Sequence, residues 1–340
     1  MKTTRLALLA LAAAVCCWLL SAATVRADET KEVTFAYQHG LTYLPFMVMD
    51  EQNLVEKHTK AAGLSCRARF VVMGGPAPIN DALVTERANF GAVGVPSLVQ
   101  LWSKTKDRMG IKAIGSLTSM PMFLNTINPN VKSLKDISGK DKIAVPSVKV
   151  SVQAVTLQMA AAQAFGKENY ASLDKYTVSL PHPDATAAML SASGGLTCHL
   201  TAPPFQYQQL RDPKIRKILS SYDVLGGKST FVLAVSTEKF RTDNPKTFDA
   251  VVKALNEAQD WINANHDAAA DVYLKMTKSK EKKEEITAQM SDPEIEFTVV
   301  PKNIFKYAEF MNEVDPKNIK HKAASWKDLC FSHLHDKQGS

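Results

Sequence analysis

The sequence predicts an α/β protein whose two lobes face each other across a cleft. Short apolar stretches of strand length alternate with helical patterns through most of the chain, which indicates βαβ units with parallel strands. The order strand, turn, helix, strand, proline-marked turn, helix occurs at residues 70–100 and again at 176–210, without any sequence repeat. About 310 residues follow the first 27, and this is more than a single core usually holds.

Residues 1–27 are predicted to be a signal peptide. A basic start (Lys2, Arg5) precedes a nearly continuous apolar run at residues 6–20, and small residues lead to a cleavage site after Ala27. A membrane anchor is the alternative, but this run is shorter than the roughly 20 residues that a span needs. Cleavage would lower the formal net charge from +7 to +4, because Lys2, Arg5 and Arg26 are the only charged residues that it removes.

Apolar periodicity predicts the elements of the first lobe. Short apolar runs bounded by turn residues indicate strands, and apolar residues spaced three and four apart indicate helices. The predicted strands are residues 33–37, 66–73 and 111–117. A helix is expected over residues 46–55, ending near residue 57.

Residues 70–100, FVVMGGPAPINDALVTERANFGAVGVPSLVQ, are the most informative stretch. A Gly-Gly-Pro turn and a Gly-Val-Pro-Ser turn each follow a strand and open a helix. Helix N-termini at an open sheet edge carry free backbone N–H groups that can bind a small polar or anionic ligand. No nucleophile, acid/base pair or metal cluster accompanies them in the sequence, which favours binding over catalysis.

The second lobe is predicted to follow the same plan. Its expected strands are residues 142–145, 176–180 and 197–200, and its expected helices are residues 151–165, 184–193 and 205–210. Gly166 can cap the first of these helices. Extended crossovers between the lobes are expected near residues 119–126 and 230–235.

The remaining chain is predicted to return to the first lobe. Asn244-Pro245 starts a strong amphipathic helix, since one face carries Phe248, Val251, Val252, Leu255, Ala258, Trp261 and Ile262. The expected division is lobe one at residues 28–119 and 235–340 and lobe two at residues 120–234.

Four segments together resemble a known family. They are FGAVGVPS at residues 90–97, SLKDISGKDKIAVP at 133–146, FRTDNP at 240–245 and ASWKDL at 324–329, in one order across nearly the whole mature chain. They are similar to segments of the periplasmic substrate-binding proteins of ABC importers, of the nitrate/sulfonate/taurine (NMT1-like) type.

The resemblance implies a two-lobe Venus flytrap of the type II periplasmic-binding-protein fold. Such a protein captures a small organic molecule or oxyanion between its lobes and delivers it to a membrane permease, with a hinge and no bond breaking. It would be a periplasmic monomer without a cofactor, and not an enzyme. A sensor that presents the solute to a receptor is an alternative that one sequence does not separate from a transporter.

The candidate ligand-binding residues lie at expected strand ends and helix starts around the cleft. They are Gln38, His39, Tyr43, Gly75, Val95, Ser97, Ser151, Gln153, His182 and Thr201. Hydroxyl and N–H groups at a helix start can contact a ligand, and the resemblance implies solute contacts in the loop after the first strand. Structural roles remain open for several of them: Gly75 in a tight turn, Ser151 as an N-cap and Tyr43 packed under its loop.

The charge of the solute is constrained by what the second lobe lacks. Many family members carry an acidic residue before the proline of that lobe, where this chain has CHLTAPP at residues 198–204. No arginine falls in the expected cleft loops, and Lys149 is the nearest cation. An aminated solute such as taurine and a bidentate clamp on a sulfonate are therefore disfavoured. A neutral or weakly anionic organic molecule fits better.

Other function classes receive little support. No basic stripe with interleaved aromatic residues indicates nucleic-acid binding, and His182 and His199 lack a third clustered ligand for a metal. Thiamine-pyrimidine synthases share the superfamily, but this chain lacks their cysteine cluster. The three cysteines of the mature chain allow one disulfide and one free thiol, and their spacing does not choose between pairings.

Overall fold

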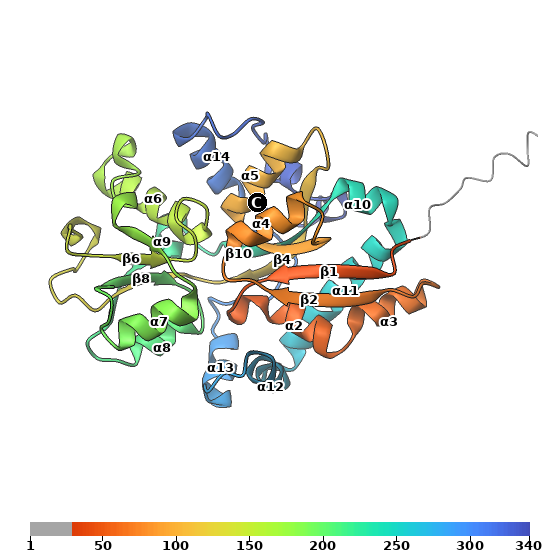
Figure 1. The fold of residues 1–340 in the computed structure, drawn as a ribbon, viewed down its shortest axis with the longest axis horizontal. Helices are drawn as coiled ribbons and strands as arrows, with labels where there is room; N and C mark the ends of the chain where they lie inside the picture. The colour runs from red at the N-terminus through yellow and green to blue at the C-terminus, as the bar shows by residue number, and fades with distance from the viewer. Residues whose placement is uncertain (1–28) are drawn as a thin grey trace, which may run out of the picture.

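The computed structural model describes residues 29–340, so the predicted signal peptide and its cleavage site lie outside the described residues. Two five-stranded sheets with helices on both sides form two lobes that lie side by side (Figure 1). The two-lobe α/β fold predicted from the sequence is therefore confirmed.

The first sheet has the strand order β2-β1-β3-β10-β4. Its strands are β1 (Glu32–Tyr37), β2 (Arg67–Val72), β3 (Phe90–Gly94), β4 (Ile111–Ser119) and β10 (Thr230–Thr237). At its centre Phe35 of β1 stacks between Phe70 and Phe90, with ring centroids 4.5 and 4.9 Å away. Buried rings of this size contribute much of the apolar burial that stabilises a core.

The second sheet repeats this topology in the order β7-β6-β8-β5-β9. Its strands are β5 (Phe123–Thr126), β6 (Ile143–Val145), β7 (Thr177–Ser179), β8 (Cys198–Thr201) and β9 (Arg216–Ser220). In each sheet the fourth strand in spatial order is antiparallel to both neighbours. The parallel βαβ pattern predicted from the sequence does not extend to these two strands, β10 and β5, which were expected only as crossovers: each enters its sheet from the other lobe.

Helices cover both sheets. They are α2 (Leu44–Glu51), α3 (Leu54–Ala61), α4 (Pro76–Val84), α5 (Val95–Thr105), α6 (Val152–Phe165), α7 (His182–Leu190), α8 (Phe205–Leu210), α9 (Ser221–Leu225), α10 (Glu238–Asp243), α11 (Pro245–Ala264), α12 (His266–Thr277), α13 (Lys283–Met290) and α14 (Phe305–Val314). Gly166 caps α6 with a φ of 94°, as predicted. The single helix predicted at residues 46–55 was wrong: Asn53 adopts the left-handed conformation (φ 51°) and separates α2 from α3.

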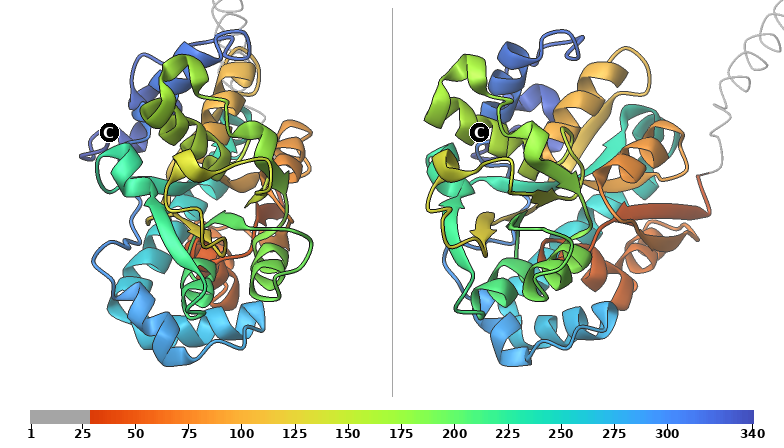
Figure 2. Two further views of the ribbon diagram at one scale, coloured as in Figure 1. Left: turned by 90° about the vertical axis from the view of Figure 1, so that its left-hand side faces the viewer. Right: turned by 60° about the vertical axis from the view of Figure 1, so that its left-hand side comes forward.

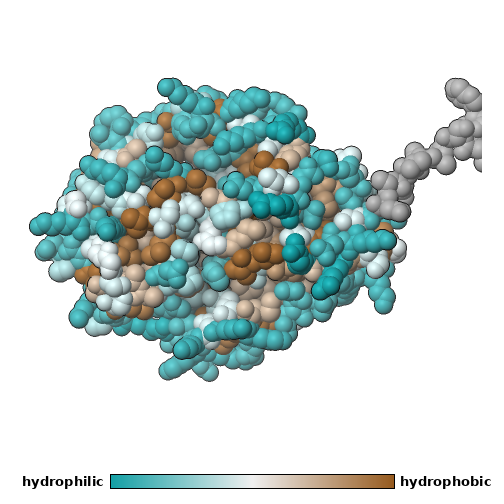
Figure 3. Space-filling view, viewed as in Figure 1, coloured by the Kyte–Doolittle hydropathy of each residue, from teal (hydrophilic) through white to brown (hydrophobic). Residues whose placement is uncertain are grey.

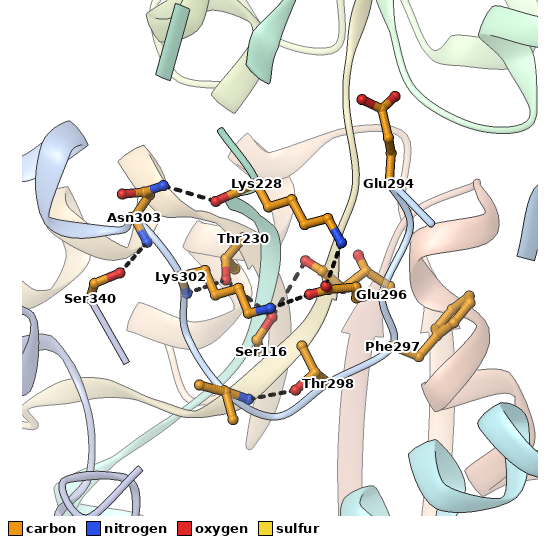
Figure 4. A network of polar contacts seen from close by, with 12 residues as sticks. Ser116, Lys228, Thr230, Glu294, Glu296, Phe297, Thr298, Lys302, Asn303 and Ser340 are labelled. Atoms are coloured by element: carbon orange, nitrogen blue, oxygen red, sulfur yellow. Dashed lines mark hydrogen bonds and ion pairs between the residues drawn. The ribbon is translucent and has the colours of Figure 1, made fainter. Parts of the chain in front are cut away.

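Three segments connect the lobes. The chain passes from β4 to β5 at residues 120–122 and from α9 to β10 at residues 226–229, and residues 294–303 run beside both passages. Ser119 and Glu296 exchange backbone hydrogen bonds of 2.8 and 2.9 Å, and Thr230 N donates to Lys302 O over 2.9 Å. The Glu296 carboxylate accepts from Lys228 Nζ at 2.8 Å and also from Lys302 (Figure 4). These bonds tie the connections into one unit.

The C-terminal helices contact the second lobe on two sides. Figures 1 and 2 show α13 beside α8 on one side, with α12 behind it, and α14 beside α6 on the other. Tyr307 of α14 shares a hydrogen bond of 2.7 Å with Thr156 of α6, and the ring of Tyr207, in α8, lies against the segment after α13 through a 3.4 Å bond to Asp292. The second lobe is thus held between two parts of the C-terminal segment.

Two further features concern the described residues as a whole. None of their helices is long and apolar enough to cross a membrane. Cys66, Cys198 and Cys330 are all buried free thiols, so the possible disulfide is not formed.

Candidate functional site: the cleft between the lobes

A small cavity lies where the two lobes meet. Its volume is about 20 Å³, room for about one water molecule. The lobes touch around it: Leu41 N donates to Pro203 O over 3.1 Å, and a Cβ atom added to Gly94 would lie 2.8 Å from Cβ of Val152. The structure therefore represents a closed conformation, and a solute larger than water requires the lobes to separate.

Six of the ten candidate residues line this cavity. They are Gln38, His39, Tyr43, Ser151, Gln153 and His182. They come from the loop after β1 and from the N-terminal ends of α6 and α7. These are the strand ends and helix starts at which the sequence analysis placed them. Their contact with a ligand stays a prediction.

The other four candidates do not line the cavity. Gly75 faces Pro146 and Ser147 across the lobe boundary, where an added Cβ would meet the Pro146 carbonyl at 3.0 Å. The backbone of α5 carries Val95 and Ser97 inward, where both are fully buried.

Two of these four have polar partners in the protein interior. Ser97 Oγ accepts from Asn80 Nδ2 at 3.3 Å, and the Thr201 hydroxyl lies 3.1 Å from His182 Nδ1. A Ser97→Trp change intended to block closure would therefore disrupt the core of the first lobe. It is not a clean probe of the cleft.

Sequence reasoning missed the aromatic part of the cavity wall. Phe205, at the start of α8, stacks on the His182 ring with centroids 5.5 Å apart, and Phe231 reaches the cavity from β10. Phe205 follows the Pro203-Pro204 turn as Ser97 follows its own proline turn, so the repeated plan of the lobes contained a usable signal. No sequence signal marks Phe231, because it lies in a segment that was predicted only as a crossover between the lobes.

Local structure holds the polar side chains of the cavity in place. Ser151 caps α6: its hydroxyl accepts from Ala154 N at 3.2 Å and donates to Ser147 O at 2.8 Å. Burial raises the pKa of Tyr43, although a hydrogen bond with Gln38 opposes this shift. The phenol is therefore protonated at neutral pH and can donate a hydrogen bond.

The described cavity wall contains no side chain that is permanently charged. Among the described residues that line it there is no Lys, Arg, Asp or Glu. Burial, and to a smaller extent the nearby His39, lowers the pKa of His182 to about 3, so its ring is neutral at pH 7. Such a wall offers hydrogen bonds and aromatic faces to a ligand but no lysine, arginine or carboxylate.

The two buried histidines do not form a metal site with a third ligand. His182 Nδ1 and His199 Nε2 are 2.9 Å apart and bond to each other. Within residues 29–340 no group of three or more His, Cys, Asp or Glu side chains is placed to hold a metal ion.

The rim of the cleft carries an ion-pair contact that spans the lobes. Arg211, which follows α8, lies 2.7 Å from Glu281 and 2.5 Å from Glu285 of the α13 region. Half-exposed pairs of this kind contribute about 0.2–1 kcal/mol each. Figure 3 shows the hydrophilic rim of this face, with apolar residues gathered toward its middle.

We expect Arg211→Met to shift the ligand-free protein toward the open form by a factor of roughly 3 to 10, because the two pairs form only when the lobes approach. Spin-label distance measurements across the cleft would detect this. Lys275→Met is the matched control, since Lys275 pairs with Glu51 at 2.6 Å without spanning the lobes. Identical distance distributions for wild type and Arg211→Met would contradict the expectation.

Similarity to solved structures supports the architecture. The alkanesulfonate-binding protein SsuA from Xanthomonas axonopodis pv. citri superposes with a TM-score of 0.68 at 14% identity, over 86% of this chain and 97% of that one. The periplasmic nitrate-binding protein NrtA from Synechocystis PCC 6803 gives 0.65 at 12% identity, over 89% and 85% of the two chains. SsuA from Escherichia coli gives 0.64 at 14% identity, over 88% and 99%. The protein therefore has the two-lobe fold of the periplasmic binding proteins.

The family follows from the sequence itself. Residues 26–276 match the model of the NMT1-like family, so the chain belongs to that family. No curated protein sequence matches it significantly.

Proposed function

We propose that this protein is the extracytoplasmic solute-binding component of an ABC import system. It would capture one small molecule between its lobes and pass it to a membrane permease. The cavity in the lobe interface carries this proposal, because it gathers hydrogen-bonding groups from both lobes at the point where they close. The signal-peptide pattern of residues 1–27 supports export to the periplasm.

The proposed solute is a neutral or weakly anionic organic molecule. The related folds that bind a sulfonate or nitrate support a small polar solute as the class. The absence of Lys and Arg from the described cavity wall argues against a strong anion, which would need compensation for its lost hydration. Tyr43, Gln153 and the stacked pair of His182 and Phe205 supply donors, acceptors and aromatic surface instead.

Native mass spectrometry of the purified mature protein tests the function. The mass of the native protein is compared with that of the denatured chain, and a discrete excess names a bound solute by its mass. Without an excess, a thermal-shift screen of small solutes follows, in which a ligand at 100 times its Kd stabilises by about 2.7 kcal/mol. A broad panel that yields neither bound mass nor stabilisation would contradict the proposal.

A further inference from the structure

A chain of buried polar side chains runs from the interior of the second lobe to the cavity wall. Its members, in order, are Asn125, Gln209, His199, His182 and Gln153. The four links measure 3.0, 2.6, 2.9 and 3.0 Å in that order, and none of the five side chains is more than 8% exposed. Bulk solvent therefore does not reach the inner members.

In such a chain the direction of one hydrogen bond determines the next. A neutral imidazole has one N–H donor and one acceptor nitrogen, so a ring that accepts on one side must donate on the other. Burial lowers the pKa of both His182 and His199. His39 lowers the pKa of His182 further, and His182 lowers that of His199 further. A cationic ring here would also place a second N–H against a neighbouring donor.

The inner end of the chain has a fixed direction. Asn125 Nδ2 donates to the backbone carbonyl of Gln206 over 3.1 Å, and a carbonyl can only accept. The same amide group donates to Gln209 Oε1 over 3.0 Å, so the Gln209 NH2 group faces His199 Nδ1 at 2.6 Å and donates to it. Turning Asn125 over would put its amide oxygen against the Gln206 carbonyl.

This direction passes through both rings to the cavity. His199 accepts at Nδ1, so its proton is on Nε2 and points at His182 Nδ1. Because His182 Nδ1 accepts this bond, the proton of His182 is on Nε2. The Thr201 hydroxyl lies 3.1 Å from the same Nδ1 atom. In the structure the atom 3.0 Å from His182 Nε2 is Gln153 Nε2, so the N–H of His182 would meet a second donor there. The amide oxygen and nitrogen have nearly the same shape, so a half-turn of the Gln153 amide supplies an acceptor.

We propose that the chain holds the Gln153 amide with its oxygen on His182 and its NH2 group toward the cleft. The solute then presents a hydrogen-bond acceptor at this point, such as a carbonyl, carboxylate or sulfonyl oxygen or a ring nitrogen. This inference rests on the proposed binding function and narrows its solute class. Gln153 is a contact residue in it, and His182, His199, Gln209 and Asn125 are positioning residues.

The tautomers of the two rings test the proposal without any ligand. In ¹⁵N-histidine-labelled mature protein at pH 7, long-range ¹H–¹⁵N spectra should show both rings protonated at Nε2 and bare at Nδ1. Signals lost in His182→Asn and in His199→Asn provide the assignment. A proton on Nδ1 of His182, or a coupling through a hydrogen bond between His182 Nε2 and Gln153 Nε2, would overturn the proposal.

Two variants test which end of the chain of polar side chains sets the direction of its hydrogen bonds. Gln153→Leu should leave both rings protonated at Nε2, whereas Asn125→Ala should let the Nδ1-protonated form of His199 become populated. The opposite pattern would overturn the proposal, and if Asn125→Ala does not fold, the wild-type tautomers decide alone. A structure of the complex with the recovered solute gives a last test. If the solute offered only hydrogen-bond donors to Gln153, the proposed acceptor would be refuted, but the binding function would stand.

Discussion

Replacing Gly94 by valine should prevent the lobes from closing and lower the affinity for the solute by roughly 5- to 150-fold. Gly94 ends β3 with a φ of −68°, which any residue adopts, so the backbone tolerates the change. The added Cβ, however, would lie 2.8 Å from Cβ of Val152 at the start of α6, across the lobe boundary. Overpacking of this kind costs about 1–3 kcal/mol, and here only the closed form bears the cost.

Native mass spectrometry and small-angle scattering would measure this effect as a lower share of solute-bound protein and a larger radius of gyration. Gly139→Val is the matched control, because a Cβ at Gly139 meets nothing within 4 Å. Combining Gly94→Val with Val152→Gly exchanges the two side chains across the contact and should restore closure. Full solute retention by folded Gly94→Val protein would show that the closed contact is not used in binding.

The sequence predicts most of the architecture because its signals are local. Proline and glycine turns mark the starts of α4 and α5, and apolar periodicity over a long helix marks α11. The errors occur where tertiary contacts decide. A left-handed Asn53 divides one predicted helix, and β10 reverses direction because it arrives from the other lobe.

The candidate site is predictable only as a region. The strand-end rule finds Gln38, Ser151 and His182 on the cavity wall, since it identifies which loops meet at the cleft. It does not give side-chain direction within those loops. Ser97 and Thr201 therefore turn out to be buried inside their own lobes, and Phe231 is missed.

The pair of buried neutral histidines should make the protein unstable in acid. The pKa of His182 is lowered to about 3 and that of His199 is lowered as well, mainly by burial, while an unfolded histidine titrates near 6.5. Between pH 6.5 and 3 the unfolded chain therefore binds protons that the folded one does not, and the free energy of unfolding falls as the pH falls. From pH 7 to pH 5 the His182 ring contributes a loss of about 2 kcal/mol, and the His199 ring adds a loss in the same direction.

Urea denaturation at pH 7 and pH 5 measures this loss, and substitutions isolate the share of the histidines. His182→Gln and His199→Gln should each lower stability at pH 7 yet lose less stability than wild type between the two pH values, by about 2 kcal/mol for His182→Gln. All carboxylates are common to these proteins, so their own acid effects cancel in the comparison. Thr186→Val is the control for destabilisation alone, since it removes a hydroxyl 3.4 Å from Gln209 but no titrating group, and it should keep the wild-type pH dependence. If the histidine variants also kept it, the two rings would have to bind protons in the folded protein over the same pH range as in the unfolded chain.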